Sequence, residues 1–428
     1  MEMRGPSIPK RGSEVTAIRE LSTRFHYGWV MVAACCVVAS SYGIFFSFGV
    51  FLKPLQLDLG GSRALISSVQ SGHLIVEAIS SIVLGKITDR HGPRLAVSIG
   101  AILLGVGLLL CSRARTLPEF YAAYMVASFG SGMSWSPTIA TVQRWFGRHG
   151  MAVGLVTAGL GAGALVYAPL CSYLISVYGW QACFAIIGIG TSAVMLACAL
   201  LLVRSPEDRG LMPYGMKNAL GQTARSSCPQ SRDGWTVHET LRSGAFYGLV
   251  IISVAAVLPQ QTIGVHLVPF ATDMGIDKTL AASAIGLVGA ISVIGRITMS
   301  MVSDRIGWVR GITICCGACA LTLLWLIFTD NSWMLYVFVL VYGYFYGGKV
   351  PLIPGATAHF FGTRALGELT AIVHALSMSF AALGPFLGGW IYDVSGSYSL
   401  VFLMCGAMWG LAAVISIGLK PPVKQSSI

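Results

Sequence analysis

The stretch GKITDRHGPR, residues 85–94, has a second copy in the same chain, and this repetition decides the predicted fold. When the sequence is shifted by 215 residues, it meets SMVSDRIGWVR, residues 300–310. Three pairs of identical residues then coincide: Asp89 with Asp304, Arg90 with Arg305 and Gly92 with Gly307. The same shift brings WFG at 145–147 onto FFG at 360–362. Matches this far apart predict two homologous halves.

The composition indicates a chain that lies mostly in a lipid bilayer. Of its 428 residues, 55% are hydrophobic and 11% are charged, whereas about a quarter are charged in a soluble domain. Crossing a hydrocarbon core of about 30 Å takes roughly 20 apolar residues. Twelve stretches meet this requirement, at about 28–52, 64–84, 95–112, 118–141, 150–174, 180–203, 244–270, 280–301, 311–329, 333–358, 367–391 and 397–419. We therefore predict an all-α membrane protein with twelve transmembrane helices, in two six-helix halves related by pseudo-two-fold symmetry.

The predicted halves divide the chain into five segments. A linker rich in Arg, Ser, Pro and Gly separates them and lacks apolar periodicity. The segments are an N-terminal tail (1–26), an N-terminal half (27–203), the linker (204–243), a C-terminal half (244–419) and a C-terminal tail (420–428).

Basic residues gather on one side of the predicted spans. The formal net charge is +11, and 21 of the 28 Lys and Arg residues fall in the tails and in the loops on the side of the tails. Five fall on the other side, and Arg296 and Lys349 fall inside spans. The positive-inside rule then predicts a multi-pass protein of the plasma (inner) membrane with both termini in the cytoplasm. Because topology explains the charge, we expect the lipid bilayer and no nucleic acid as a partner.

Several kinds of chemistry have no counterpart in the sequence. The tail before the first span lacks a signal-peptide pattern, and ten of the eleven cysteines lie in or at the ends of spans, without the spacing of a metal site or a disulfide framework. No GxxxxGK[ST] phosphate loop and no nucleophile-base arrangement occurs. We expect no catalytic residues, no metal and no cofactor, and thus a protein that is not an enzyme.

The repeated motif resembles the signature of the major facilitator superfamily between spans 2 and 3, and the resemblance covers nearly the whole chain. The shared pattern is a glycine, then an aspartate and an arginine, then a glycine and a basic residue. Parallel repeats related by an axis along the membrane normal are a transporter architecture. The resemblance therefore implies transport by the rocking of two halves about a central site.

The charges of this motif predict a lock that holds the halves together on the cytoplasmic side. Its predicted members are Gly85, Asp89, Arg90, Arg94, Asp304 and Arg305. We expect a helix to end at Gly85, and Asp89 to accept hydrogen bonds from a neighbouring helix N-terminus. The arginines can pair with carboxylates or with lipid phosphate. The alternative is that these charges only determine the topology.

Narrower features resemble the branch of monocarboxylate transporters and oxalate-formate antiporters. They are YGWVMV (27–32), RWFGRHGMAVGLVTAGLGAG (144–163) and PEDRGLMPYG (206–215). The resemblance implies a small organic anion as the substrate. The glycines of the second motif also remove side chains from a helix, so that a neighbour can approach closely and slide, or simply pack tightly.

Arg296 stands near the middle of a predicted span, where a charge is costly unless it faces a wet or paired interior. Its guanidinium cannot deprotonate and offers a planar fork of donors that fits a carboxylate. The alternative is a pair with a fixed acid, but Ser292, one turn earlier, stands where the resembled animal transporters carry an aspartate. The resemblance implies that this span-8 arginine holds the substrate anion.

Lys349 is the second cation inside a span, in YFYGGKVPLIP at 344–354. It either snorkels to the headgroups or faces the cavity and attracts anions. Two lysines of the resembled branch are absent, because Ser377 stands at the span-11 position and Phe46 or Ser47 at the span-1 position. Without them, a monocarboxylate is favoured over a small dicarboxylate.

His73 and Glu77 lie four residues apart on span 2, hence on one helix face. Burial favours the neutral form of a carboxyl group, and histidine titrates near physiological pH. The pair could therefore carry a proton, and the superfamily arrangement implies that His374 of span 11 joins it at a gate. The alternative is a hydrogen bond between helices and no coupling.

Four further polar or aromatic side chains at membrane depth are predicted substrate contacts: His266, Gln260, Tyr346 and Trp135. Pro259 and Pro269 bracket His266, and we expect them to break the helix so that freed carbonyls line a cavity. Tyr346 belongs to a series of tyrosines at every second position, 342, 344 and 346, so they cannot all face the same side of a helix. Trp135 can either line the pocket or pack at the boundary.

The predicted function is secondary active transport of a small organic anion by a monomer working through alternating access. Symport of a monocarboxylate such as lactate or pyruvate with a proton is favoured, because it would be electroneutral. Anion exchange of the oxalate-formate type is the alternative. Drug-proton antiporters and non-transporting sensors share the scaffold, but the former predict a buried acid as the anchor and the latter a long cytoplasmic extension.

Overall fold

The computed structural model describes residues 27–146, 150–212, 214, 235–362 and 366–422. The predicted N-terminal tail, most of the linker and the end of the C-terminal tail lie outside this part. Nearly all of the described chain is helical, and an isolated β-bridge joins Phe146 to Tyr214.

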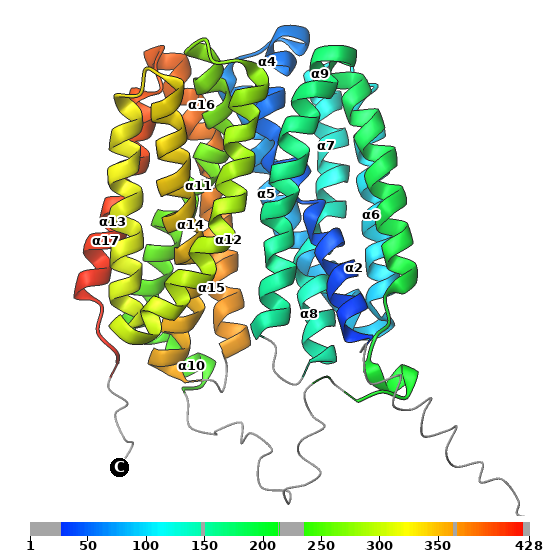
Figure 1. Cartoon of the computed structure of the whole chain (residues 1–428), viewed down its shortest axis with the longest axis vertical. Coiled ribbons are helices and arrows are strands. Elements are labelled where there is room, and N and C mark those ends of the chain that lie inside the picture. Colours follow the sequence, from blue (N-terminus) through cyan, green and yellow to red (C-terminus); the bar gives the residue numbers. More distant parts are fainter. Residues whose placement is uncertain (1–26, 147–149, 213, 215–234, 363–365, 423–428) are drawn as a thin grey trace, which may run out of the picture.

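The helices run in chain order along two bundles (Figure 1). The first bundle consists of α2 (Gly28–Ser40), α3 (Gly43–Phe46), α4 (Phe48–Leu59), α5 (Arg63–His91), α6 (Pro93–Cys111), α7 (Leu117–Ser131), η1 (Gly132–Ser134), α8 (Ser136–Trp145) and α9 (Gly150–Leu201). Two short helices follow, η2 (Pro206–Arg209) and α10 (Val237–Leu241). The second bundle consists of α11 (Gly244–Asp273), α12 (Lys278–Ile306), α13 (Trp308–Ile327), α14 (Ser332–Phe361), α15 (Leu366–Ala381), α16 (Leu383–Ser395) and α17 (Ser399–Gly418).

These helices account for all twelve predicted spans. Ten segments of the described chain are long and apolar enough to cross a membrane. One of them, within α9, contains two passes, because Gly179 has a φ of 82° and interrupts the helix. The broken helix formed by α7, η1 and α8 supplies the remaining pass at residues 117–145.

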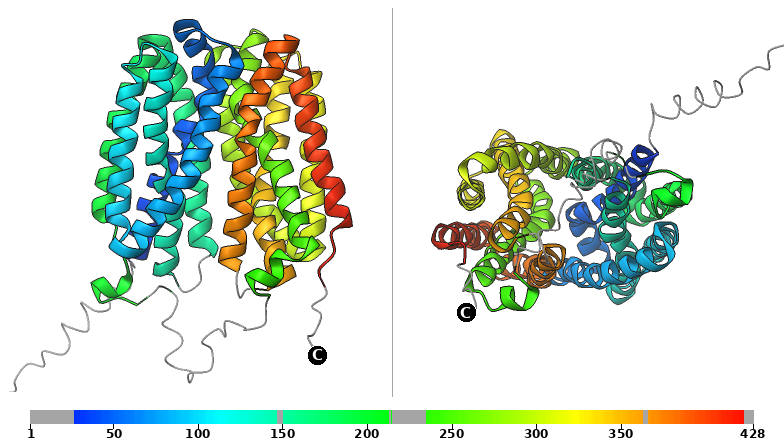
Figure 2. Two further views of the ribbon diagram at one scale, coloured as in Figure 1. Left: turned by 180° about the vertical axis from the view of Figure 1, so that it is seen from behind. Right: turned by 90° about the horizontal axis from the view of Figure 1, so that it is seen from below.

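Each bundle has its own hydrophobic core. One cluster of buried side chains runs from Met31 to Leu202, and the other from Phe246 to Ala413, with one residue each from the opposite bundle. Figure 2 shows the two bundles side by side, seen from behind and from below. The two bundles are therefore packed around separate cores. We call the end where α2 begins and α17 ends the proximal end, and the opposite end the distal end.

The helix that was predicted to end at Gly85 continues to His91, so this prediction is wrong. Gly92 ends it, with a φ of 91°, and Gly307 ends α12 with a φ of 94°. A positive φ costs glycine little and other residues much more. The second glycine of the repeated motif therefore terminates the helix in both halves, whereas Gly85 lies within the helix.

The predicted break at Pro259 and Pro269 is also wrong, because α11 runs through both prolines. A proline inside a helix leaves the carbonyl four residues earlier without its usual donor. For Pro269 this is the carbonyl of Val265, which lies against Gly49 of α4, where an added Cβ would come within 2.6 Å of the oxygen. The freed carbonyl is thus covered by a neighbouring helix.

The glycines at the start of α9 serve two different contacts. Those at 159 and 163 face α2, and a Cβ on Gly163 would overlap the carbonyl of Ser40. Gly161 instead faces α12 of the other bundle, where an added Cβ would lie 2.6 Å from the carbonyl oxygen of Gly289. Gly154 faces open space. The close approach of helices expected from this motif therefore occurs both within and between the bundles.

Replacing Gly163 by alanine is expected to destabilise the protein, because the new methyl group meets backbone that cannot rotate away. Overpacking of this kind typically costs about 1–3 kcal/mol. The thermal midpoint of the purified protein in detergent should fall by several degrees. Gly154→Ala, on the same helix with nothing within 4 Å of the added Cβ, should leave it unchanged or slightly higher. Equal midpoints for the two variants would contradict the packing described here.

Candidate functional site

A pocket lies between the two bundles. The N-terminal bundle contributes Phe46, Gly161 and Ala164 to its wall. The C-terminal bundle contributes Gln260, Ile263, Gly264, Ile285, Val288, Gly289, Ser292, Arg296, Tyr342 and Tyr346. Because both bundles form the wall, a tilt of one against the other changes the shape of the pocket.

Arg296 carries the charge of this pocket. It lies on α12, one turn after Ser292, whose hydroxyl donates to the carbonyl of Gly289. The Nη1 of Arg296 donates to the carbonyl of Thr157 in the other bundle at 3.0 Å, and its buried Nε has no hydrogen-bond partner. No carboxylate in the described part of the chain forms an ion pair with it. The guanidinium therefore retains donors that an anion could use.

Gln260 and Tyr346 share the wall with Arg296 and contact each other. The amide Nε2 of Gln260 donates to the hydroxyl of Tyr346 at 3.3 Å. Helices α11, α12 and α14 thus bring three predicted substrate contacts together. The other side chains of the wall are largely apolar, so the pocket is suited to a small molecule with an anionic end and an apolar body.

Lys349 is not part of this wall. Its side chain is 3% exposed, and its Nζ lies 5.7 Å from the ring centroid of Trp409 on α17, within the range of a cation–π interaction. The lysine is thus enclosed in the C-terminal bundle. Burial at this level does not fit the alternative in which the ammonium group snorkels to the headgroups.

The three predicted proton-coupling residues are buried or half-buried but are not joined by hydrogen bonds within the described part of the chain. His73 is fully buried, stacks on Phe45 with ring centroids 4.0 Å apart, and has no hydrogen-bond partner at either ring nitrogen. Glu77 is 5% exposed. His374 instead stacks on Trp135 of the other bundle, with centroids 5.4 Å apart and planes 9° from parallel. Neither His374 nor Trp135 lines the pocket.

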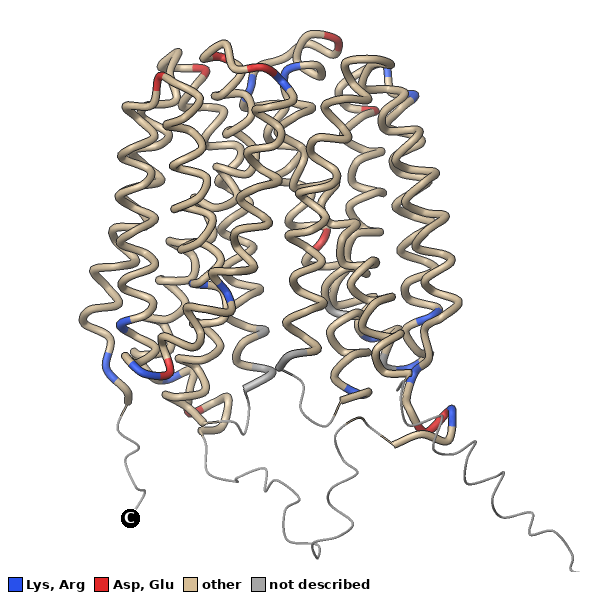
Figure 3. Tube along the Cα trace, in the orientation of Figure 1, with Lys and Arg blue, Asp and Glu red and all other residues tan. Residues whose placement is uncertain are grey.

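The structure describes the side chains of four charged members of the predicted lock, Arg90, Arg94, Asp304 and Arg305. All four are exposed, and none of them forms an ion pair with another described side chain. The side chain of Asp89 lies outside the described part. Figure 3 shows that the charged residues concentrate at the two ends of the helices.

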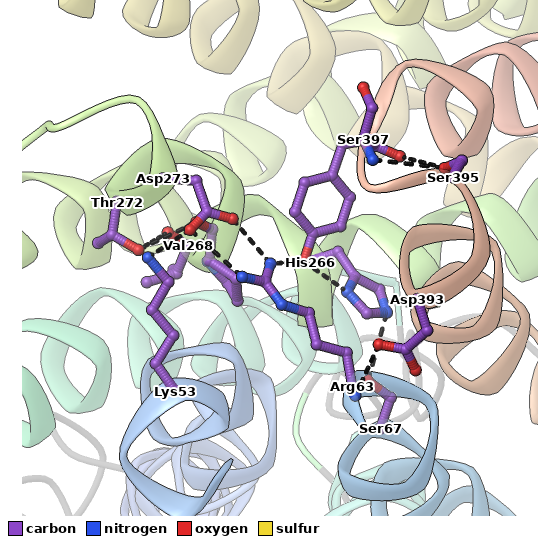
Figure 4. A network of polar contacts seen from close by, with 12 residues as sticks. Lys53, Arg63, Ser67, His266, Val268, Thr272, Asp273, Asp393, Ser395 and Ser397 are labelled. Carbon is purple, nitrogen blue, oxygen red and sulfur yellow. Dashed lines mark hydrogen bonds and ion pairs between the residues drawn. The ribbon is translucent and has the colours of Figure 1, made fainter. Parts of the chain in front are cut away.

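At the distal end, ion pairs and hydrogen bonds join the two bundles (Figure 4). Asp273 of α11 accepts from Arg63 of α5 at 2.7 and 3.3 Å, and Lys53 of α4 lies 2.7 Å from the same carboxylate. Asp393 of α16 accepts from the backbone N–H groups of Arg63 and Ala64 at 3.0 and 2.8 Å. A carboxylate from one bundle therefore caps a helix of the other.

His266 belongs to this group of contacts and not to the pocket wall. Its Nε2 lies 2.9 Å from the carbonyl of Pro385 and 3.4 Å from the hydroxyl of Ser67, and its Nδ1 lies 3.2 Å from the hydroxyl of Tyr398. The Nη1 of Arg63 donates to the same tyrosine at 2.8 Å. We call the group the distal network; it consists of Lys53, Arg63, Ser67, His266, Asp273, Asp393 and Tyr398 (Figure 4).

Sequence reasoning missed most of the distal network. Asp273 and Asp393 stand at span ends, where a solvated or capping role is ordinary. Lys53 and Arg63 entered only the comparison of positive charge on the two sides of the membrane. A usable signal was present, because the N-terminal half places Lys53 and Arg63 on the side where the C-terminal half places Asp273 and Asp393. Opposite charges on facing halves predict a contact between them.

Comparisons with known proteins agree with this architecture. The sequence profile described as Major Facilitator Superfamily matches residues 33–329 and 249–427. Monocarboxylate transporter 12 of Rattus norvegicus is 27% identical over 413 residues, which cover 89% of this chain and 82% of the relative. Monocarboxylate transporter 11 of Mus musculus is 28% identical over 407 residues, covering 92% and 87%.

Two solved structures share the fold at low identity. A bacterial homologue of the human lysosomal transporter Spinster, in an inward-facing and occupied conformation, has a TM-score of 0.72 at 12% identity, over 91% of this chain and 96% of that one. The E. coli xylose transporter XylE, in a partially occluded inward-open conformation, has a TM-score of 0.71 at 14% identity, over 93% and 100%. The predicted twelve-helix fold is thereby confirmed. The chain belongs to the major facilitator superfamily and is related, within it, to the monocarboxylate transporters.

Proposed function

We propose that this protein is a secondary active transporter of small organic anions, and that it carries a monocarboxylate together with a proton. The observation that carries the proposal is Arg296, a permanent cation in a pocket formed by both bundles, without an acidic partner among the described residues. A charge at membrane depth that lacks a fixed counterion is costly. A carboxylate substrate would supply the missing charge and fit the guanidinium fork.

Alternating access would proceed by tilting two rigid halves, residues 27–203 and 244–419. Their separate cores and the glycine contact between α9 and α12 support this motion. We infer that the proximal end faces the cytoplasm, by the positive-inside rule, and that the distal network closes the outer side here. In the other state, the repeated motifs would form the lock on the cytoplasmic side.

Glu77 is the proposed proton carrier. A shift of 215 residues brings it onto Ser292, which lines the pocket, and brings Ser81, one turn later, onto Arg296. The two halves therefore carry an acidic residue and a permanent cation on equivalent helices, α5 and α12. Protonation of this acid would remove its negative charge when the anion is bound and keep the cycle electroneutral. Exchange of two anions without a proton is the alternative mechanism.

Counterflow in proteoliposomes tests this function directly. Vesicles loaded with unlabelled lactate, pyruvate, formate or oxalate receive the labelled anion outside, with and without an inward proton gradient. We expect counterflow with a monocarboxylate in loaded vesicles, and net accumulation in vesicles without internal anion only when the gradient is present. Counterflow without gradient-driven accumulation would favour exchange. Transport of an organic cation and of none of the four anions would refute the proposal.

A further inference from the structure

The contact around Asp273 has the form of a carboxylate receptor. The guanidinium of Arg63 holds both oxygens, with Nη1 2.7 Å from Oδ2 and Nη2 3.3 Å from Oδ1, and Lys53 adds an ammonium group 2.7 Å from Oδ1. Arg63 is 8% exposed, and its Cζ lies 3.8 Å above the ring of Tyr392. Two-point binding by a stacked, buried guanidinium is the arrangement that recognises carboxylates in general.

The two sides of this contact belong to different bundles. Both cations, Lys53 on α4 and Arg63 on α5, belong to the N-terminal bundle, whereas Asp273 belongs to α11 of the C-terminal bundle. The other acid of the network, Asp393, is engaged by backbone N–H groups at the start of α5. Asp273 is therefore the one carboxylate that the two cations share among the described side chains. When the bundles part at this end, it moves away from them.

We propose that Lys53 and Arg63 form a second carboxylate-binding site, which Asp273 occupies in this conformation and which a carboxylate from the distal solution occupies when the bundles part there. The inference rests on the proposed alternating access and deepens it, because it assigns a site of first contact to the incoming substrate. The ligand class is a small carboxylate anion, the chemical group that Asp273 itself presents.

This site would couple ligand binding to the conformational change. An external carboxylate can bind the two cations only after Asp273 has left, so it binds the open state and not the closed one. A ligand with such a preference shifts the population towards the state it binds. A network that acts only as a latch would instead respond to the loss of either partner in the same way, and would be indifferent to added carboxylate.

The test measures the distance between spin labels, by pulsed electron paramagnetic resonance, while sodium acetate is added to the full-length protein. Arg113 and Asn331, which are exposed and lie between α6 and α7 and between α13 and α14, can carry the labels. We expect acetate, and not chloride at the same ionic strength, to increase the fraction of molecules with a long distal distance. The same titration in Arg296→Ala should give the same response, which separates this site from the central pocket.

Two variants distinguish the receptor from a simple latch. Asp273→Asn and Lys53→Gln both remove an ion pair, and both should increase the open fraction before acetate is added. Asp273→Asn should then respond at lower acetate, because the internal competitor is gone. Lys53→Gln should need about tenfold more acetate, as expected for the loss of one charge-assisted contact, and Lys53→Arg should restore the response. Lys278→Gln, on the same side but outside the network, serves as the matched control.

Two sets of results would overturn this proposal. If acetate and chloride act alike, or if Asp273→Asn and Lys53→Gln respond to acetate at equal concentrations, the receptor is refuted and only a latch remains. If the response disappears in Arg296→Ala and persists in Lys53→Gln, the central pocket is the site of action. Failure of the proposed transport function would appear separately, as absent counterflow, and would leave this titration unaffected.

Discussion

Arg296→Ala is expected to reduce transport of every accepted anion by at least about a hundredfold, because two charge-assisted hydrogen bonds at about 1.5–3 kcal/mol each would be lost. Arg296→Lys keeps the charge but loses the planar fork, so we expect a smaller loss, of about tenfold, in apparent affinity. The measurement is the initial rate of counterflow as a function of anion concentration in proteoliposomes. The difference between the two variants separates the effect of charge from the effect of geometry.

Arg113→Ala is the control for these variants, because Arg113 is an exposed arginine in the loop between α6 and α7, remote from the pocket. It should transport like the wild type. Thermal midpoints of all variants show whether a loss of transport reflects unfolding. Full affinity for all transported anions in both Arg296 variants would mean that the guanidinium does not hold the substrate.

Glu77→Gln is expected to abolish accumulation driven by an inward proton gradient and to leave counterflow intact. Glutamine has nearly the same shape but cannot bind or release a proton, so the variant resembles a permanently protonated carrier. Such a carrier can still exchange one anion for another, because exchange needs no net movement of protons. The measurement is the ratio of internal to external labelled anion with the gradient, compared with counterflow without it.

Glu119→Gln provides the matched control, because Glu119 is an exposed acid in the first turn of α7. It should accumulate anion as the wild type does. Unchanged accumulation in Glu77→Gln would remove this residue from the coupling mechanism. A variant that loses counterflow as well would point to a structural or substrate-binding role for the carboxyl group.

The spans and the repeat could be predicted because both depend on local composition. Apolar runs of sufficient length and a duplicated Asp-Arg pair are visible without any knowledge of packing. The break at Gly179 coincides with the gap between two predicted spans. The error at Pro269 arose because a neighbouring helix decides the outcome. Pro269 does not break α11, because Gly49 lets α4 cover the freed carbonyl of Val265.

The candidate site was predictable only in part. A charged residue in the middle of an apolar span is easily recognised in a sequence, so Arg296 could be singled out. In the structure, the polar residues Gln260 and Tyr346 lie with it in the pocket wall. The contributions of the other bundle could not be predicted, because they depend on how two halves meet in one conformation. The same holds for Arg63 and Asp273, which are 210 residues apart in the chain.

The contact between Gly161 and Gly289 has a consequence for the size of substrate that the protein can carry. Each glycine faces the backbone of the other, with added Cβ atoms 2.6 and 2.7 Å from the opposite carbonyl oxygens, and both also line the pocket. In the proposed transport cycle, the contact about which the bundles pivot therefore forms part of the wall that the substrate touches. A bulkier substrate would press on this contact and restrict the movement, so we expect turnover to fall with substrate size even where affinity does not.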